Sequence, residues 1–296
     1  MNNMFWFTLA SCSALLSAAA AVIQKKVLFR LNALEFSFLV SLIILIFSLF
    51  IPVSMNVTSI TASTVIVIVG KSILGGAAFL LVMMSLEHNP ISTALPILGM
   101  TPAGTALAAM VIIGESLHQW EWLGIGMMMA GTYVLEKRPA QKLFQPIKEV
   151  VRSKNHYYMF GALVLFAVSS VFDKLLVSGY KTDPLVVLFY QHIVYCAMFG
   201  SLLFIRRQSI QAVVQKGASQ LPFIIAAAFL TIAYRFTQLE ATKFAPVALV
   251  LAVKRTSLLY ATFFGGKIFS EEHLVQKLIG GALIVAAGFI ILRNVS

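Results

Sequence analysis

Two adjacent cations, Lys254 and Arg255, interrupt an apolar run that is long enough to cross a lipid bilayer (residues 245–265). They follow Ala245 by nine and ten residues, or about 14 to 15 Å along a helix at 1.5 Å per residue. This depth is near the bilayer midplane, where a charge is costly unless it faces a wet cavity or a partner. We expect one of the two to bind a negative group in a cavity, and the other to bond to carbonyls or an adjacent helix.

Further polar side chains lie at similar depth in other apolar runs. Arg235 belongs to a stripe with Thr231, Gln238 and Thr242, which recur at intervals of four, three and four residues along one side of a helix. Charged or polar residues inside a membrane are functional candidates by default. The candidate substrate-binding residues are Lys71, Asp173, Gln191, His192, Tyr234, Arg235, Gln238, Lys254 and Arg255.

The charges of these candidates do not balance. Asp173 is the only acidic residue well inside an apolar run, against four deep cations. It either belongs to the binding site or forms a structural ion pair with Lys71 or Arg235. His192 is either a helix-contact residue or a proton relay. A carboxylate or phosphate on the substrate would compensate the surplus positive charge.

The composition identifies a polytopic membrane protein. Of 296 residues, 59% are hydrophobic and 11% are charged, whereas a soluble domain carries roughly 25% charged residues. The net charge of +11 comes from short stretches between apolar runs, without the aromatic interleaving of a nucleic-acid site. Cys12 and Cys196 both lie in apolar runs, so neither a disulfide framework nor a metal site is predicted.

The apolar runs predict an all-α protein with ten transmembrane helices. The only long polar stretch, residues 137–156, is predicted to link a first five-helix repeat (1–136) to a second (157–296). An odd number of helices per half makes the second repeat enter from the opposite face, and such inverted repeats surround a central cavity in transporters. The predicted helices are 4–23, 34–52, 63–86, 91–114, 120–136, 157–179, 185–205, 221–239, 245–265 and 274–292.

The two halves repeat the same spacing of glutamate and glycine. Glu115 is followed by Gly124 and Gly131 at nine and sixteen residues, and Glu272 is followed by Gly281 and Gly288 at the same intervals. Paired glycines on one helix face allow two helices to approach closely. We interpret these four glycines as helix-packing residues.

Three prolines lie within or at the start of predicted helices. Pro96 and Pro102 fall in the fourth helix, and Pro246 opens the ninth. Interior prolines remove backbone hydrogen bonds and kink a helix, and the freed carbonyls are tolerated where they line a cavity or are bonded by neighbours. These positions are predicted kinks, which either serve alternating access or are plain packing kinks.

The ordered motifs of both halves resemble the ten-helix EamA-type branch of the drug/metabolite transporter superfamily. The resemblance is carried by residues 85–96, Gly114-Glu115 and the first glycine pair, and again by residues 241–246, 254–257, Glu272 and the second glycine pair. It implies a basket of ten helices around a central cavity, with helices five and ten packing the halves together. It also implies efflux or exchange of small metabolites.

The function predicted from these observations is secondary-active export or exchange of a small anionic or zwitterionic metabolite such as an amino acid, with no enzymatic activity. No ATP-binding motif appears, so a gradient of protons or another ion, or substrate exchange, would supply the energy. Efflux of cationic drugs is the alternative within transport, and a lipid-acting intramembrane enzyme is the alternative from another class. The expected partners are the substrate, a coupling ion and the bilayer, without nucleic acid, cofactor or metal, in a monomer or homodimer.

The basic residues predict the orientation in the cell membrane. Loops on the side opposite the termini hold thirteen cations, whereas the side of the termini holds three, Lys181, Lys243 and Arg293. Short basic loops stay in the cytoplasm, so both termini are predicted to lie outside. The thirteen are Lys25, Lys26, Arg30, Lys137, Arg138, Lys142, Lys148, Arg152, Lys154, Arg206, Arg207, Lys216 and Lys267.

Overall fold

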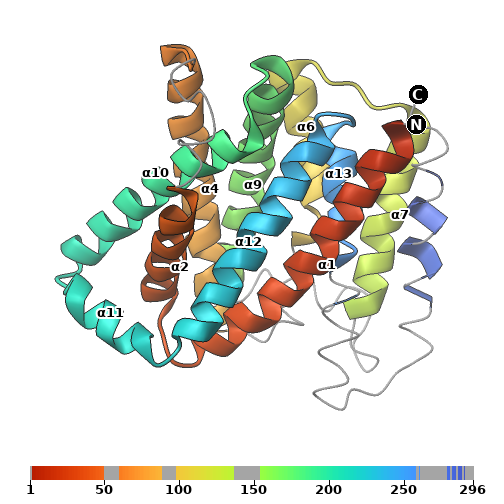
Figure 1. Ribbon diagram of the computed structural model, residues 1–296. Coiled ribbons are helices and arrows are strands. Elements are labelled where there is room, and N and C mark those ends of the chain that lie inside the picture. The colour runs from red at the N-terminus through yellow and green to blue at the C-terminus, as the bar shows by residue number, and fades with distance from the viewer. Residues whose placement is uncertain are drawn as a thin grey trace.

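The described part of the chain is built from helices (Figure 1). The computed structural model describes residues 2–49, 60–88, 98–136, 154–257 and 260, and residues 279–290 except 281, 285 and 289. The elements are α1 (Asn2–Leu28), α2 (Ala33–Ser48), α4 (Ala62–His88), α6 (Thr101–Ile113), α7 (Gln119–Glu136), α9 (Lys154–Lys174), the π-helical segment η2 (Leu175–Gly179), α10 (Pro184–Ile205), α11 (Ile210–Ala218), α12 (Leu221–Thr242) and α13 (Val247–Lys254).

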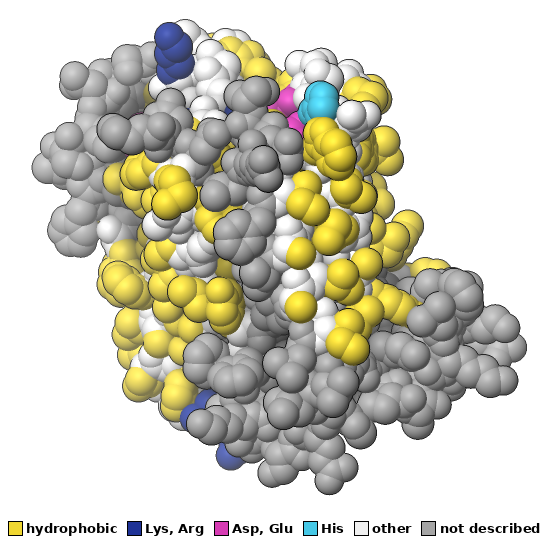
Figure 2. All heavy atoms as spheres, turned by 90° about the vertical axis from the view of Figure 1, so that its right-hand side faces the viewer, with side chains coloured by type: hydrophobic (Ala, Val, Ile, Leu, Met, Phe, Trp, Pro, Cys, Tyr) yellow, Lys and Arg dark blue, Asp and Glu magenta, His cyan; other side chains and the backbone are white. Residues whose placement is uncertain are grey.

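Five of these helices are long and apolar enough to cross a membrane: Met4–Leu28, Ala62–His88, Tyr157–Gly179, Pro184–Ile205 and Leu221–Thr242. Large hydrophobic side chains also face outward, and Val111 and Phe204 are 85% and 82% exposed. On the face in Figure 2, hydrophobic side chains cover the middle of the described surface, and the charged side chains lie toward its upper and lower margins. Lipid tails are the environment in which such a surface is stable.

One end of the helical bundle, which we call the Lys216 end, is fixed by two carboxylates (lower end in Figure 1). Glu35 forms a capping box with Asn32 at the start of α2 and accepts hydrogen bonds from Lys216 Nζ of α11 at 2.6 and 3.0 Å. Glu87, near the end of α4, accepts a hydrogen bond from the backbone N–H of Ala33 at 3.0 Å. The α1–α2 turn, the end of α4 and α11 therefore lie together.

The opposite end, which we call the Glu115 end, joins four elements (upper end in Figure 1). Glu115 lies in the connection between α6 and α7, and its Oε2 accepts a hydrogen bond from the backbone N–H of Val247, the first residue of α13, at 3.2 Å. Lys174, the last residue of α9, donates from Nζ to the carbonyl oxygens of Thr242 at 2.6 Å and Ala245 at 2.8 Å. The first of these bonds satisfies a carbonyl that the end of α12 leaves without a helical partner, and the second holds the connection to α13.

Successive helices, apart from α11, alternate in direction between the two ends (Figure 1). α1, α4, α7, α10 and α13 run toward the Lys216 end, whereas α2, α6, α9 and α12 run toward the Glu115 end. α1 packs along α12, and α4 packs along α9. A hydrophobic core that includes Phe36, Ala78, Met159, Phe199 and Ala227 fills the space between α2, α4, α9, α10 and α12.

Three boundaries differ from the sequence-based prediction. The short helix α11 was not predicted, because its nine residues are too few to span a bilayer and carry no long apolar run. The ninth helix was predicted to continue to residue 265, but α13 ends at Lys254, and Arg255 and Thr256 form a turn. α9 begins at Lys154, so residues 154–156 of the predicted linker are helical. Residues 137–153 lie outside the described part of the chain.

Two of the three prolines predicted to kink helices lie at the starts of helices. Pro102 lies in the first turn of α6, directly after a turn at residues 99–100, and Pro246 is the N-cap of α13. Proline is well tolerated in the first turn, because the N–H that it lacks would have no helical partner there. Both residues therefore start a helix, and Pro96 lies outside the described residues.

The predicted packing glycines have close neighbours where the structure describes them. A Cβ atom on Gly131 of α7 would lie 2.7 Å from Ile284 Cγ1 and 2.8 Å from the carbonyl oxygen of Gly280. A Cβ atom on Gly288 would meet Phe7 and Met128 at ordinary contact distances of 3.5 and 3.7 Å. Gly124 is buried, and Gly281 lies outside the described residues.

Candidate functional site

A cavity of about 140 Å³ lies in the middle of the bundle. That volume can hold several water molecules or a small solute. The cavity extends toward the Lys216 end, since Gln24 near the end of α1 and Leu86 near the end of α4 both line it. In the other direction, a hydrophobic cluster that includes Val171, Val247 and Leu251 lies between the cavity and the Glu115 end.

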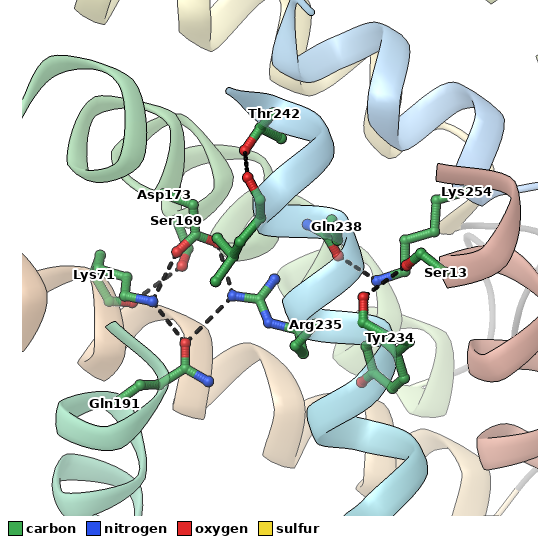
Figure 3. A network of polar contacts seen from close by, with 11 residues as sticks. Ser13, Lys71, Ser169, Asp173, Gln191, Tyr234, Arg235, Gln238, Thr242 and Lys254 are labelled. Atoms are coloured by element: carbon green, nitrogen blue, oxygen red, sulfur yellow. Dashed lines mark hydrogen bonds and ion pairs between the residues drawn. The ribbon is translucent and has the colours of Figure 1, made fainter. Parts of the chain in front are cut away.

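Asp173 is the centre of a buried ionic network at the wall of this cavity (Figure 3). Its Oδ1 accepts from Lys71 Nζ at 2.7 Å, and its Oδ2 accepts from Arg235 NH2 at 2.8 Å. Gln191 Oε1 accepts from the same two cations, at 2.6 Å from Lys71 and 3.3 Å from Arg235. Ser169 Oγ donates to the backbone carbonyl of Lys71 at 3.1 Å. The network thus ties α4, α9, α10 and α12 together.

The two cations that pair with Asp173 differ in their surroundings. The side chain of Lys71 is 0% exposed and does not line the cavity, whereas that of Arg235 is 16% exposed and lines it. The expectation that Lys71 faces the cavity is therefore wrong. A fully buried ammonium is stable only if a carboxylate and hydrogen-bond acceptors replace its water, and Asp173 and Gln191 do so here.

Lys254 has neutral partners on α12 (Figure 3). Its Nζ donates to Gln238 Oε1 at 2.5 Å and lies 4.4 Å from the ring centroid of Tyr234. Gln238 and Tyr234 are four residues apart, so they lie on one face of α12 and hold the ammonium between them. Among the described residues, no carboxylate lies within ion-pair distance of Lys254, and all three side chains line the cavity.

Arg255 also lines the cavity. It is the C-cap of α13, and its NH2 donates to Thr101 Oγ1 at the start of α6 at 2.9 Å. Lys254 and Arg255 both line the cavity, where one of the two was expected, and Arg255 in addition bonds to an adjacent helix. The two long side chains leave the last turn of a helix that ends beside the cavity, so each reaches a different neighbouring helix.

His192 lines the cavity as well, from α10. Its Nδ1 lies 2.8 Å from the carbonyl oxygen of Leu188, and its ring meets that of Tyr195 edge to face at 5.4 Å. A ring nitrogen must carry the proton to bond to a carbonyl, so in the neutral ring Nε2 is left as an acceptor. Tyr195 comes close to α4 at Gly75, which has no side chain. A Cβ atom there would lie 2.7 Å from the Tyr195 hydroxyl.

Sequence reasoning missed some cavity residues and the contacts of Lys174. Gln24, Ser170 and Leu98 line the cavity without a charge to mark them in the sequence. Lys174 bonds to two backbone carbonyls within the protein. Those carbonyls lie 68 and 71 residues farther along the chain, so the sequence around Lys174 gave no sign of them.

Comparison with known proteins identifies the family. The model of the EamA-like transporter family matches residues 4–136 and again residues 154–293. The chain belongs to the EamA-like transporter family. A solved structure, described only as a crystal structure of a protein, shares the fold with a TM-score of 0.72 and 16% sequence identity, over 96% of this chain and 95% of that chain. No curated protein matches the chain significantly.

Membership confirms the resemblance inferred from the motifs. EamA-like transporters are membrane proteins that move small molecules, and they are not enzymes. The apolar helices described above agree with a multi-pass membrane transporter. In an EamA-like transporter, a central cavity with charged side chains is the natural place to look for the substrate.

Proposed function

We propose that this EamA-like transporter is a secondary-active exporter or exchanger of a small anionic or zwitterionic metabolite, such as an amino acid. In this proposal, the negative group of the substrate binds Lys254 and Arg255 in the central cavity. The observation that carries the proposal is the position of Lys254, whose described partners are an amide and an aromatic ring. A carboxylate on the substrate would give the Lys254 ammonium the anionic partner that it does not have among the described residues.

The charges around the cavity support an anionic substrate over a cationic one. Both oxygens of Asp173 already bond to cations, Lys71 and Arg235, so this carboxylate is not available to a cationic drug. Lys254 lies close enough to Arg235 and Arg255 for like-charge repulsion to act on it. A bound carboxylate would relieve that repulsion and form charge-assisted hydrogen bonds, which are stronger than neutral ones.

The proposed architecture is ten transmembrane helices in two inverted five-helix repeats, predicted as 1–136 and 157–296, with a linker that ends where α9 begins at Lys154. It is supported by the helix directions, because α1, α2, α4 and α6 run opposite to α9, α10, α12 and α13, respectively. Inverted repeats are suited to alternating access, in which the two halves rock around a fixed site. A cavity that extends toward the Lys216 end fits one of the two alternating states.

The proposed orientation in the cell membrane places the Lys216 end in the cytoplasm and both termini outside. The support is the charge bias of the connections. Among the described residues, the connections at the Glu115 end contain Lys181 and Lys243, whereas the Lys216 end holds Lys25, Lys26, Arg30, Arg206, Arg207 and Lys216. Positive charge of this kind is retained in the cytoplasm.

The test is flux through the purified protein in liposomes, with a panel of radiolabelled amino acids, small organic acids and a cationic dye. We expect an acid-bearing solute to be transported and Lys254→Gln to reduce its flux. A hydrogen bond to a charged group contributes about 1.5–3 kcal/mol, so the reduction should be about 10- to 100-fold. Lys243→Gln removes an equivalent charge outside the cavity, where Lys243 pairs with Glu240, and should leave flux unchanged.

Two results would contradict this proposal. Transport of the cationic dye alone would favour cationic-drug efflux. Equal flux in Lys254→Gln and the unaltered protein, with both folded to the same extent, would exclude Lys254 as the anion-binding residue.

A further inference from the structure

Glu115 is held in position by the end of α6. Gly114, the C-cap of α6, adopts a left-handed conformation with φ of 66°, which glycine adopts at little cost. The backbone N–H of Glu115 then donates to the carbonyl oxygen of Ala109 at 3.2 Å. This turn aims the carboxylate at the first residue of α13 instead of at solvent, and the Glu115 side chain is 16% exposed.

The Glu115 carboxylate has few partners for a group that is largely buried. The backbone N–H of Val247 gives it one hydrogen bond, although an ionised carboxylate has about four acceptor sites. Lys174 Nζ lies 3.9 Å from Oε1, a long ion pair without a hydrogen bond, because the ammonium donates to the carbonyls of Thr242 and Ala245. Within the described residues, one hydrogen bond and one long ion pair are therefore all that replaces the water around the Glu115 carboxylate.

These contacts lie where the cavity is closed. Lys174 ends α9 and bonds to the end of α12, and Val247 starts α13, so Glu115 and Lys174 together join three helices to the α6–α7 connection. Directly beneath this joint, Val171, Val247 and Leu251 form the hydrophobic cluster above the cavity. Among the described residues, this joint and the cluster beneath it separate the Glu115 end from the cavity.

We propose that Glu115 is a proton-binding site whose occupancy controls the opening of the Glu115 end. The proposal rests on the proposed transport function, to which it adds the coupling ion. In the closed joint, a proton from water adds to one carboxylate oxygen of Glu115, and the other oxygen still accepts from Val247. When the joint opens, water solvates the carboxylate, and the proton returns to the solution.

The sign of the coupling follows from the surroundings of Glu115. Burial raises the pKa of Glu115 above its ordinary value, and Glu121 of α7 acts in the same direction, whereas Lys174 and the Val247 N–H lower the pKa. Glu240 and Lys243, near the end of α12, pair with each other. Because burial dominates, the closed joint binds the proton more tightly than a hydrated carboxylate would. Low pH therefore favours the closed joint, and rising pH favours opening.

Two measurements on the full-length protein in liposomes test the proposal without any substrate. The first is infrared titration of protonated carboxyl groups. We expect a carboxylic-acid band that persists above the ordinary glutamate pKa of about 4.3, is lost as pH rises, and is absent in Glu115→Gln. The control Glu240→Gln removes the glutamate paired with Lys243 and should keep the band.

The second measurement is the distance between spin labels across the joint. The labels are placed at Gln119→Cys of α7 and Tyr180→Cys after η2, which are both exposed, in a protein whose Cys12 and Cys196 are replaced by Ala. From about pH 5 to about pH 8, the longer-distance population should grow with Glu115 present. In Glu115→Gln, which mimics the protonated acid, the short distance should persist at every pH.

The outcomes separate this proposal from the transport proposal. A carboxyl band that does not depend on Glu115, or a distance that changes with pH equally in Glu115→Gln, would overturn the proton site. If Glu115→Gln does not fold, Glu115→Asp replaces it, and an unchanged pH midpoint for both readouts would overturn the proposal. Absence of flux with both readouts intact would instead reject the transport proposal.

Discussion

Replacement of Asp173 with Asn would remove the negative charge from the centre of the bundle while keeping the size of the side chain. In the native network, this carboxylate compensates Lys71, whose side chain is 0% exposed, and Arg235, whose side chain is 16% exposed. Asparagine can still accept a hydrogen bond, but it offers no charge. The variant would therefore leave the Lys71 ammonium buried beside a second cation without compensation.

The expected cost is large because the network is buried. Removing one partner of a buried ion pair costs about 3–5 kcal/mol, whereas an exposed pair contributes about 0.2–1 kcal/mol. Since 1.4 kcal/mol is a factor of ten, Asp173→Asn should shift the unfolding equilibrium by more than about 100-fold. Glu240→Gln is the matched control, because it breaks the Lys243–Glu240 pair, whose side chains are 28% and 21% exposed.

The assay is reversible unfolding in mixed micelles, followed by the fluorescence of Trp6, Trp120 and Trp122. Adding Lys71→Met to Asp173→Asn should recover much of the lost stability, because the second change removes the uncompensated buried charge. A loss in Asp173→Asn no greater than that in Glu240→Gln would refute the reasoning. A double variant less stable than Asp173→Asn would also refute it, since it would show that charge compensation is not the cause.

Two further predictions concern access and orientation. In a protein without its native cysteines, Arg235→Cys should react with a small water-soluble thiol reagent, and substrate should protect it. Lys71→Cys should not react. Reaction of Lys71→Cys but not of Arg235→Cys would contradict the position of Lys71 behind the cavity wall. A fluorescent reporter that matures only in the cytoplasm should stay dark when fused after Ser296 and should glow when inserted near Gln145, and the opposite pattern would reject the orientation proposed from the basic loops.

The sequence was sufficient to select the charged residues that line the cavity, because charged residues are rare inside apolar runs and each is conspicuous there. It could not decide between a binding role and an ion pair for Asp173. Lys71 and Asp173 are 102 residues apart, and only the packing of α4 along α9 brings them together. Lys71 was assigned to the cavity for the same reason, since depth in a helix does not reveal which way a side chain points.

The elements that were missed are those that the apolar pattern does not mark. α11 packs on α2 through Gly217, where a Cβ atom would lie 2.5 Å from Leu39 Cδ1, and one glycine in a polar stretch does not predict such a contact. The end of α13 at Lys254 was missed because residues 245–265 form a single apolar run. Membrane length alone favours one continuous helix there, but the polar partners of Lys254 and Arg255 lie on α12 and α6.

The short helix α13 connects the two proposals. Its first residue, Val247, is held by Glu115, and its last residue, Lys254, is held by Gln238 in the cavity. Eight residues span about 12 Å at 1.5 Å per residue, so this one helix connects the cavity to the joint. If a bound carboxylate moves α13 together with Lys254, the contact between Val247 and Glu115 changes as well. In the proposed mechanism, the substrate and the proton act on opposite ends of one helix, so each changes the affinity of the protein for the other.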